Sequence, residues 1–397
     1  MKEIKKIIIK QYPEDFLVIE KMAKNRIREF MSTQLGRFCI FILKKRGVDM
    51  LSAIRTLSKI YNIREKAFSY SGTKDKKALT IQYCSVFGRI YDKTVSFGNS
   101  GDFIDVKVIG FSNSPISLGD HLGNEFIINV RNISDQKYFE LKKEYELKKD
   151  AKNSESFDKN SPLIPNFFDS QRFGIFHNNH VIGKFIVLSR FEEATNMIKE
   201  QMGEKINHKL SKLSGLEFLK ALNSKQAMMY IHSYQSFIFN NAVSSFIEEN
   251  FDCFKLNYDF GKLAFPKKNS GEISKLYRNM KINLAGFGFE SNGKINKYVL
   301  KEMKKEGVKD RDFIIRQIPM LSAESQKRDF LIKLKNFNLK TINSEDGTTR
   351  ILKDKGKIKN TTQTTKDNVF QVKFTLGRGS YATIVIAALF NQIPIVL

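Results

Sequence analysis

The sequence predicts an α+β protein built on a mixed, largely antiparallel sheet with packed helices. Short runs of alternating apolar residues indicate strands, and these strands outnumber the helices between them. Their spacing is not the regular strand–helix–strand alternation of a parallel sheet. A hydrophobic content of 41% in 397 residues allows two or three domains, each with its own core.

Strands are predicted on both sides of one helix in the amino-terminal region. A first strand precedes a turn at Tyr12 and Pro13. The helix begins near Asp49, an acceptable N-cap, has one apolar face and ends near Asn62. The other strands expected here are residues 15–20, 37–43, 103–108 and 126–130.

Two further strand-like runs, within residues 68–84, flank a tight loop of sequence Ser-Gly-Thr-Lys-Asp-Lys-Lys at residues 71–77. Gly72 can take a positive φ in such a loop. Its one carboxylate, Asp75, lies among three lysines, whose charges favour the ionised form. This arrangement suits an anionic nucleophile or base presented to a polyanion. The alternative interpretation is a solvated turn with mixed charges.

A second candidate motif is Asn-Phe-Phe-Asp-Ser-Gln-Arg-Phe-Gly at residues 166–174. Its three aromatic residues are interleaved with Asn166, Gln171 and Arg172. Such a segment can stack on a nucleobase and hydrogen-bond to it. A buried aromatic strand with a polar edge is the alternative.

The remaining elements follow from periodicity and composition. Apolar residues at helical spacing predict a helix over residues 224–249. After a strand at residues 370–376, Ser380 is expected to cap a helix at residues 381–390, whose free N–H groups can hold a phosphate or a base edge. Two polar stretches are predicted surface loops, the second a hairpin tip or an RNA-touching loop: residues 146–161 and 344–368.

The charge balance points to a polyanionic partner. Lys and Arg total 67 against 42 Asp and Glu, which leaves a net charge of +25 and favours nucleic acid. A membrane is the weaker choice, because apolar runs such as residues 381–390 are about half as long as a spanning helix. The cysteines and histidines are too few and too scattered to predict disulfides or a metal site. The expected compartment is therefore the cytoplasm.

Four stretches, in order along the chain, resemble motifs of the TruD family of pseudouridine synthases: residues 13–20, 72–82, 166–174 and 379–383. A further stretch, residues 236–240, resembles a motif of the domain inserted in TruD enzymes. The resemblance covers most of the chain. It implies a pseudouridine-synthase-like catalytic domain with an inserted α/β domain peculiar to TruD. The implied division is catalytic domain (first part), insertion and catalytic domain (second part), at residues 1–176, 177–325 and 326–397.

The resemblance also implies roles for individual residues. Asp75 matches the catalytic aspartate, Phe168 the aromatic residue that packs on the target base, and Asn166 a residue close to the catalytic loop. Asp169 stands where the family usually has glycine, which predicts a local difference in the backbone. Asp75 is expected to have a cationic partner, and its identity is left open among Lys21, Lys74 and Arg172. These three residues, with Phe168, Asn166 and Gln171, form the predicted substrate-binding set.

The implied reaction breaks the C1′–N1 bond of a uridine and joins C1′ to C5 of the same uracil. Nothing is oxidised and no group leaves the site, so neither a cofactor nor a metal is expected. Asp75 can attack C1′ as a nucleophile or take a sugar proton to give a glycal. The predicted protein is a monomeric isomerase acting on tRNA, at uridine 13 of the D-arm. Two alternatives stay open: the same chemistry on more RNA sites, and a non-catalytic RNA-binding protein.

Overall fold

The computed structural model describes residues 6–32, 35–98, 100–149, 164–267, 277–342 and 368–396. Within these ranges the chain forms two compact units. The first comprises Met1–Ser161, Lys333–Gly379 and Pro394–Leu397, and the second comprises Pro162–Ile332 and Ser380–Ile393. The units are defined by compactness alone, so the functional division at 176/177 and 325/326 stays a prediction.

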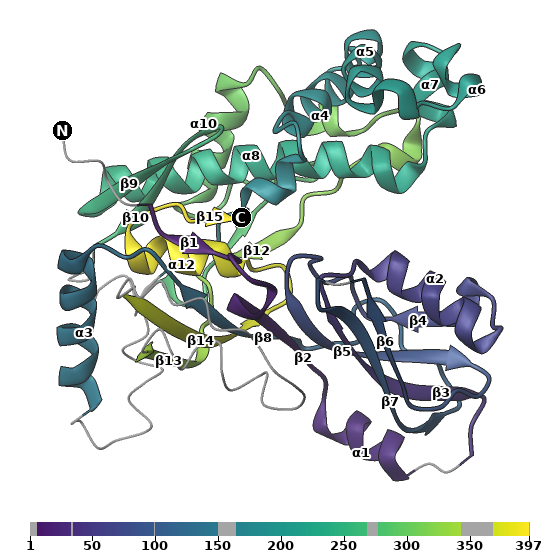
Figure 1. The fold of residues 1–397 in the computed structure, drawn as a ribbon. Coiled ribbons are helices and arrows are strands. Elements are labelled where there is room, and N and C mark those ends of the chain that lie inside the picture. The colour runs from purple at the N-terminus through teal and green to yellow at the C-terminus, as the bar shows by residue number, and fades with distance from the viewer. Residues whose placement is uncertain are drawn as a thin grey trace. The chain divides into compact units, whose positions relative to one another are not determined.

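The first unit is organised on one nine-stranded mixed sheet (Figure 1). Only β2 and β5 run parallel, with Leu17 opposite Leu79, and all other neighbouring pairs of this sheet are antiparallel. In sheet order the strands are β13 (Lys335–Ile342), β14 (Val369–Gly377), β8 (Gly123–Val130), β2 (Phe16–Lys21), β5 (Leu79–Phe87), β3 (Phe38–Arg46), β7 (Asp102–Ser112) and β6 (Lys93–Phe97), and β4 (Phe68–Tyr70) pairs with β5. The predicted strands are therefore present in a mixed, largely antiparallel sheet.

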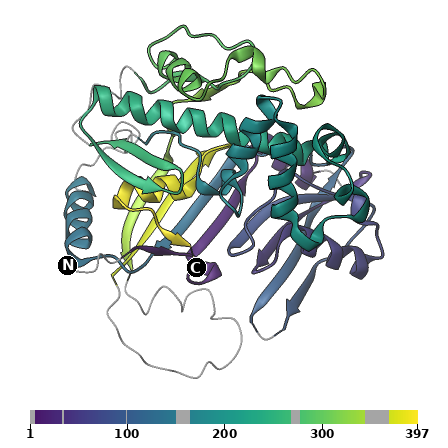
Figure 2. The ribbon, with the colours of Figure 1, turned by 90° about the horizontal axis from the view of Figure 1, so that it is seen from above.

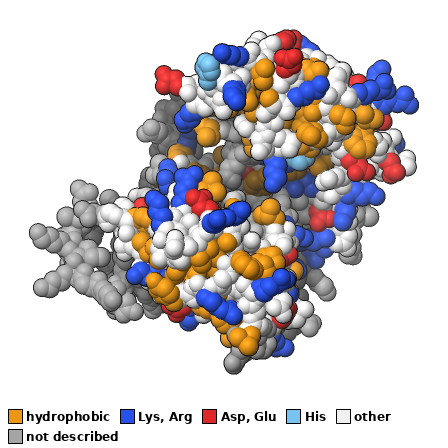
Figure 3. Space-filling view, turned by 90° about the vertical axis from the view of Figure 1, so that its right-hand side faces the viewer, with side chains coloured by type: hydrophobic (Ala, Val, Ile, Leu, Met, Phe, Trp, Pro, Cys, Tyr) orange, Lys and Arg blue, Asp and Glu red, His pale blue; other side chains and the backbone are white. Residues whose placement is uncertain are grey.

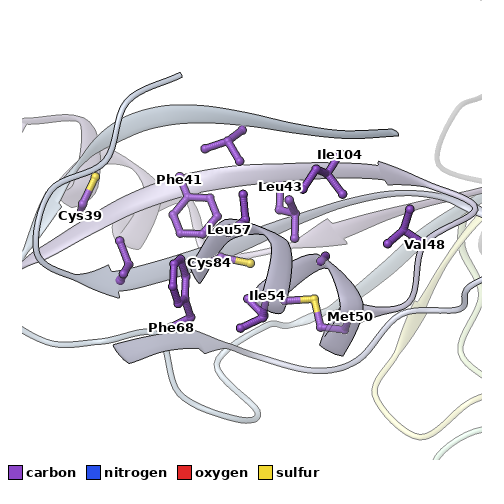
Figure 4. Close-up of a cluster of buried hydrophobic side chains, with 13 residues drawn as sticks. Cys39, Phe41, Leu43, Val48, Met50, Ile54, Leu57, Phe68, Cys84 and Ile104 are labelled. Atoms are coloured by element: carbon purple, nitrogen blue, oxygen red, sulfur yellow. The ribbon is translucent and has the colours of Figure 1, made fainter. Parts of the chain in front are cut away.

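The helix predicted after Asp49 is α2 (Met50–Tyr61). The Asp49 carboxylate accepts a hydrogen bond from the Ser52 N–H at 2.9 Å, and Asn62 ends the helix in the left-handed conformation. One face of α2 packs on the sheet in the hydrophobic cluster of Figure 4, whose labelled members include Phe41, Ile54 and Leu57. This part of the sequence prediction is confirmed.

A second cluster lies on the opposite face of the sheet, under α1 (Lys24–Ser32). It contains Phe30 and Ile40, and Ile40 alternates along β3 with Phe41 of the first cluster. Gly110 of β7 lets α1 approach closely, since a Cβ there would lie 1.7 Å from the Phe30 carbonyl oxygen. The sheet is thus covered on both faces in this region (Figure 1).

The short strand β1 and the helix α3 also belong to the first unit. The strand predicted before Tyr12 is only β1 (Ile8–Ile9), which pairs in parallel with β15 (Ile395–Val396). α3 (Asp135–Lys149) includes residues 146–149, so the loop predicted over 146–161 is wrong there. Strong helix formers such as Glu, Leu and Lys dominate that stretch. The rest of that loop and residues 344–367 of the other predicted loop lie outside the described residues.

The second unit is built on α8 (Ser224–Asn250), which confirms the predicted long helix. α4 (Asn179–Val187), α10 (Asn296–Lys305) and the hairpin β9–β10 (Cys253–Tyr258 and Gly261–Pro266) pack against it (Figure 2). The α4–α8 crossing is close, because a Cβ at Gly183 would lie 2.1 Å from the Tyr230 carbonyl oxygen. Its other elements are α5 (Phe191–Met202), α6 (His208–Ser211), α7 (Gly215–Ala221), the pair β11 (Lys281–Asn283) and β12 (Lys327–Asp329), and α12 (Ala382–Phe390).

The alternative interpretation of residues 166–174 as a buried aromatic strand is wrong, because they run through an irregular segment and a 3₁₀ helix, Ser170–Phe173. One expectation also fails in the second unit. Ser380 does not cap α12, whose N-cap residue is Tyr381 and makes no side-chain capping bond. The Ser380 hydroxyl instead lies 3.1 Å from the Asn166 side-chain oxygen, a tertiary partner that competes with local capping.

Candidate active site

The Asp75 loop, residues 71–77, joins β4 to β5 and is tied to its surroundings by hydrogen bonds. The Gly119 N–H donates to the Ser71 carbonyl at 3.0 Å, and the Gln82 amide donates to the Gly72 carbonyl at 3.1 Å. Gly72 does not adopt a positive φ, contrary to expectation, because these contacts, rather than a left-handed residue, shape the turn. Tertiary contacts therefore set the loop conformation.

Asp75 forms an ion pair with Lys10, a residue absent from the predicted site. The Lys10 Nζ lies 2.6 Å from an Asp75 carboxylate oxygen. The Lys10 side chain is only 4% exposed and lies over the Phe16 ring, whereas the Asp75 side chain is 37% exposed. The carboxylate is thus anchored from the protein side and open toward solvent. The sequence signal, a lone lysine directly after the apolar run Ile-Ile-Ile at residues 7–9, was weak.

The predicted cationic partners of Asp75 have other contacts. Lys21 pairs with Glu125 at 3.0 Å. Lys74 pairs with Glu20 at 2.6 Å, and both of these side chains are buried. Because a buried carboxylate needs a counter-charge, Lys74 points inward and ties the loop to β2. The substrate-binding roles of Lys21 and Lys74 stay predictions, and Arg172 belongs to the second unit.

Lys45, on β3, binds the backbone of the Asp75 loop. Its fully buried ammonium group donates to the backbone carbonyl of Asp75 at 2.8 Å and lies 3.4 Å from that of Lys74. Burial lowers the pKa of Lys45 to about 8, although the nearby Asp75 charge opposes the shift. Three lysines, Lys10, Lys45 and Lys74, thus hold the backbone and the carboxylate of this loop.

The buried charge of Lys45 predicts a pH-dependent stability. Its pKa is lowered from 10.5 to about 8 on folding, so the unfolded chain binds more protons between those values and stability rises with pH across that window. We expect the free energy of unfolding of the wild type, minus that of Lys45→Met, to increase by about 2 to 3 kcal/mol from pH 8 to 10.5. Urea unfolding at several pH values measures this difference. Lys44→Met, on the same strand, is the control, and an equal slope for both variants would contradict the assignment.

In the second unit the backbone of Phe168 is held by one side chain. The Phe168 N–H donates to the Asn240 side-chain oxygen at 2.9 Å, and the Asn240 amide donates to the Phe168 carbonyl at 2.8 Å. Asn240 is fully buried on α8, within the family-like residues 236–240. Within that stretch, Asn240 therefore fixes the backbone position of Phe168.

Two arginines and two aromatic residues surround the Phe168 ring. The Arg328 guanidinium lies 3.8 Å from the ring centroid and that of Arg172 lies 5.4 Å from it. Phe239 and Tyr381 make edge contacts with the ring. Burial lowers the pKa of Arg328 to about 10 and lowers that of Arg172, yet both groups stay charged at neutral pH. The ring therefore lies in a positively charged setting, which favours an anionic ligand.

Asn166 is fixed by its neighbours through both ends of its amide. Its side-chain oxygen accepts from Arg328 at 2.9 Å and contacts Ser380, and its amide nitrogen donates to the Asp329 carbonyl at 3.2 Å. Arg172 donates to the Ser236 hydroxyl at 3.1 Å. Gln171 is exposed, so it belongs to the surface of this cluster. Asn166, Phe168 and Arg172 are thus brought together within the second unit.

Removal of the Asn240 amide is expected to destabilise the second unit. Asn240→Ala leaves a buried N–H and a buried C=O of Phe168 without partners, which costs about 2 to 4 kcal/mol. Thermal or urea unfolding measures the loss. Asn241→Ala is the matched control, because Asn241 is half-buried and its amide makes a long, 3.4 Å contact with Glu302. Equal stability of the two variants would show that Asn240 does not hold Phe168.

No group of three or more His, Cys, Asp or Glu side chains that could bind a metal ion occurs among the described residues. In the same part of the chain, no helix is both long enough and apolar enough to cross a membrane.

Comparison with known proteins identifies the family. The family model described as tRNA pseudouridine synthase D (TruD) matches residues 5–214 and 206–389. The chain is 27% identical to the "Probable tRNA pseudouridine synthase D" of Nanoarchaeum equitans, over 97% of this chain and 98% of that protein. It is 26% identical to the tRNA pseudouridine synthase D of Aquifex aeolicus, over 97% of this chain and 98% of that protein. The chain belongs to the TruD family.

A solved structure supports the same conclusion for the fold. A crystal structure of a TruD protein from Methanosarcina mazei matches with a TM-score of 0.63 at 24% sequence identity, and covers 97% of this chain and 93% of that one. The predicted α+β class and the resemblance to TruD are both confirmed.

Proposed function

We propose that this protein is a tRNA pseudouridine synthase that isomerises uridine 13 of the D-arm with Asp75 as its catalytic residue. The proposal extends the family membership to a substrate and a residue. The observation that carries it is the Asp75 carboxylate, open to solvent on one side and paired with the buried Lys10 at 2.6 Å on the other. We place the enzyme in the cytoplasm as a monomer.

The reaction needs one carboxylate and no redox step. The C1′–N1 glycosidic bond breaks, the uracil turns, and C1′ bonds to C5, while C5 loses a proton and N1 gains one. Asp75 serves either by attacking C1′ or by removing the sugar proton that gives a glycal, and both routes fit its exposed carboxylate. Lys10 orients the carboxylate in either route, through the contact of 2.6 Å.

The positive charge of the chain fits an RNA substrate. The net charge is +25, and Lys and Arg side chains are widespread on the face drawn in Figure 3. We propose that Phe168 packs on the detached base, since stacking on an aromatic ring contributes about 1 to 3 kcal/mol per base. The basic setting of its ring, with Arg172 and Arg328, supports binding of an anionic nucleotide.

The test is nucleotide-resolution mapping of pseudouridine in a purified tRNA transcript incubated with and without the wild-type protein. We expect one modified position, uridine 13, and none in a transcript carrying cytidine at that position. Modification at several other uridines would favour the alternative of a broader RNA specificity. RNA that is bound but never isomerised would overturn the proposal and favour a non-catalytic RNA-binding protein.

A further inference from the structure

Two leucines protrude from a loop that touches the Asp75 loop. Residues 117–122, here called the leucine loop, carry Leu118 and Leu122, whose exposed fractions are 73% and 63%. Single exposed apolar side chains are ordinary on protein surfaces. These two are four residues apart on a segment hydrogen-bonded to residue 71, four positions before the proposed catalytic aspartate. Their position calls for a functional explanation.

The leucine loop is held at three points within the first unit. The Gly119 N–H donates to the Ser71 carbonyl at 3.0 Å, and the Arg378 guanidinium donates to the Gly119 carbonyl. The Leu122 N–H donates to the Lys21 carbonyl at 2.7 Å. Gly119 has φ +89°, and a Cβ there would lie 2.8 Å from the Arg378 side chain, so the turn requires glycine. The leucines are therefore presented on a constrained backbone.

Two hydrogen bonds within the leucine loop also stabilise its turn. The Ser117 N–H donates to the Asp120 carboxylate at 2.8 Å, and the Asp120 N–H donates to the Ser117 carbonyl at 3.1 Å. These two bonds fix the segment that carries Leu118. Because its backbone is already ordered, the leucine loop loses little conformational entropy when the two leucines contact a ligand.

The charged side chains near the two leucines are mostly basic, and the exception on the leucine loop is the exposed Asp120, whose carboxylate accepts the Ser117 N–H. Lys21, which accepts the Leu122 N–H through its carbonyl, has a side chain 40% exposed, and Arg378 is exposed. Lys76 and Lys77 are exposed on the Asp75 loop itself. An apolar pair in a mostly basic setting complements a ligand that combines apolar flat faces with negative charge. Nucleobases on a phosphate backbone have that combination, whereas an apolar protein surface would not match the lysines.

We propose that Leu118 and Leu122 form an apolar wedge that contacts the bases beside the target uridine and occupies the space left when that uridine unstacks. The inference rests on the proposed function and adds an RNA-contacting surface to it. Extrusion of a base from a stack is unfavourable, and apolar side chains inserted between base steps are a known way to favour it. The link from Gly119 to Ser71 places this event next to the loop that carries Asp75.

The test compares the double variant L118A/L122A with L51A, because Leu51 is a similarly exposed leucine, 58% exposed, on α2. The RNA is a tRNA transcript with 2-aminopurine beside the modified uridine, whose fluorescence rises when the stack opens. We expect L118A/L122A to lower the fluorescence change and the single-turnover rate by about tenfold, with L51A like the wild type. All three proteins should have the same melting temperature, since the substituted side chains are exposed.

A second substrate distinguishes a specific loss of base unstacking from a general loss of enzyme activity in L118A/L122A. On a short single-stranded RNA with the same uridine, which needs no unstacking, L118A/L122A should react at nearly the wild-type rate. Equal losses on both substrates, or no loss on the tRNA, would overturn the wedge. If the wild type makes no pseudouridine at all, the proposed function fails; the fluorescence change, compared between wild type and L118A/L122A, then still decides whether the wedge exists.

Discussion

Asp75→Asn is expected to abolish pseudouridine formation, with a single-turnover rate lower than that of the wild type by about 10³-fold or more. The amide is nearly isosteric with the carboxylate but can neither attack C1′ nor accept a sugar proton. It also loses the charge that pairs with Lys10, whose Nζ lies 2.6 Å away. RNA affinity should change little or increase, because a negative charge is removed near a polyanion.

The measurement is pseudouridine yield against time with enzyme in excess over tRNA, together with RNA binding by filter retention. Asp105→Asn is the matched control, because Asp105 lies on β7 of the sheet that carries the Asp75 loop and its carboxylate accepts from the Thr94 hydroxyl at 2.5 Å. If Asp75→Asn still forms pseudouridine at the wild-type rate, the catalytic assignment is wrong.

Lys10→Met is expected to have the second-largest effect, a loss of about 10²-fold in single-turnover rate with a much smaller change in RNA affinity. The substitution keeps most of the side-chain volume but leaves Asp75 without the ammonium group that orients it. The remaining Asp75 carboxylate is 37% exposed, so water can solvate its charge, but water does not hold it in one orientation. The expected loss is therefore one of positioning, because the Lys10 ammonium group contacts the carboxylate from the buried side.

Lys6→Met removes the same charge from an exposed position four residues earlier and serves as the control. Lys10→Arg, which keeps the charge but not the compact ammonium, should retain part of the activity. A wild-type rate for Lys10→Met would show that the ion pair is structural only. An equal loss for Lys6→Met and Lys10→Met would indicate that overall charge, rather than contact with Asp75, matters.

Much of the fold was predictable because local rules suffice for it. The α2 helix follows from the Asp49 cap and apolar spacing, and α8 follows from periodicity over many turns. Predictions failed where a distant partner outweighed the local one. Ser380 bonds to Asn166 instead of capping α12, and Gly72 needs no positive φ because Gln82 and Gly119 hold the loop.

The α+β class, the membership of the TruD family and the lysine-rich loop that carries Asp75 could all be inferred before the fold was known. These depend on residue types and their order within short stretches. The cations that contact that loop are set by the fold. β1 pairs with β15 near the other end of the chain, and Lys10, 65 residues before Asp75, contacts the Asp75 carboxylate. Electrostatic partnership depends on distance in space, and Lys74, adjacent in sequence, instead neutralises the buried Glu20.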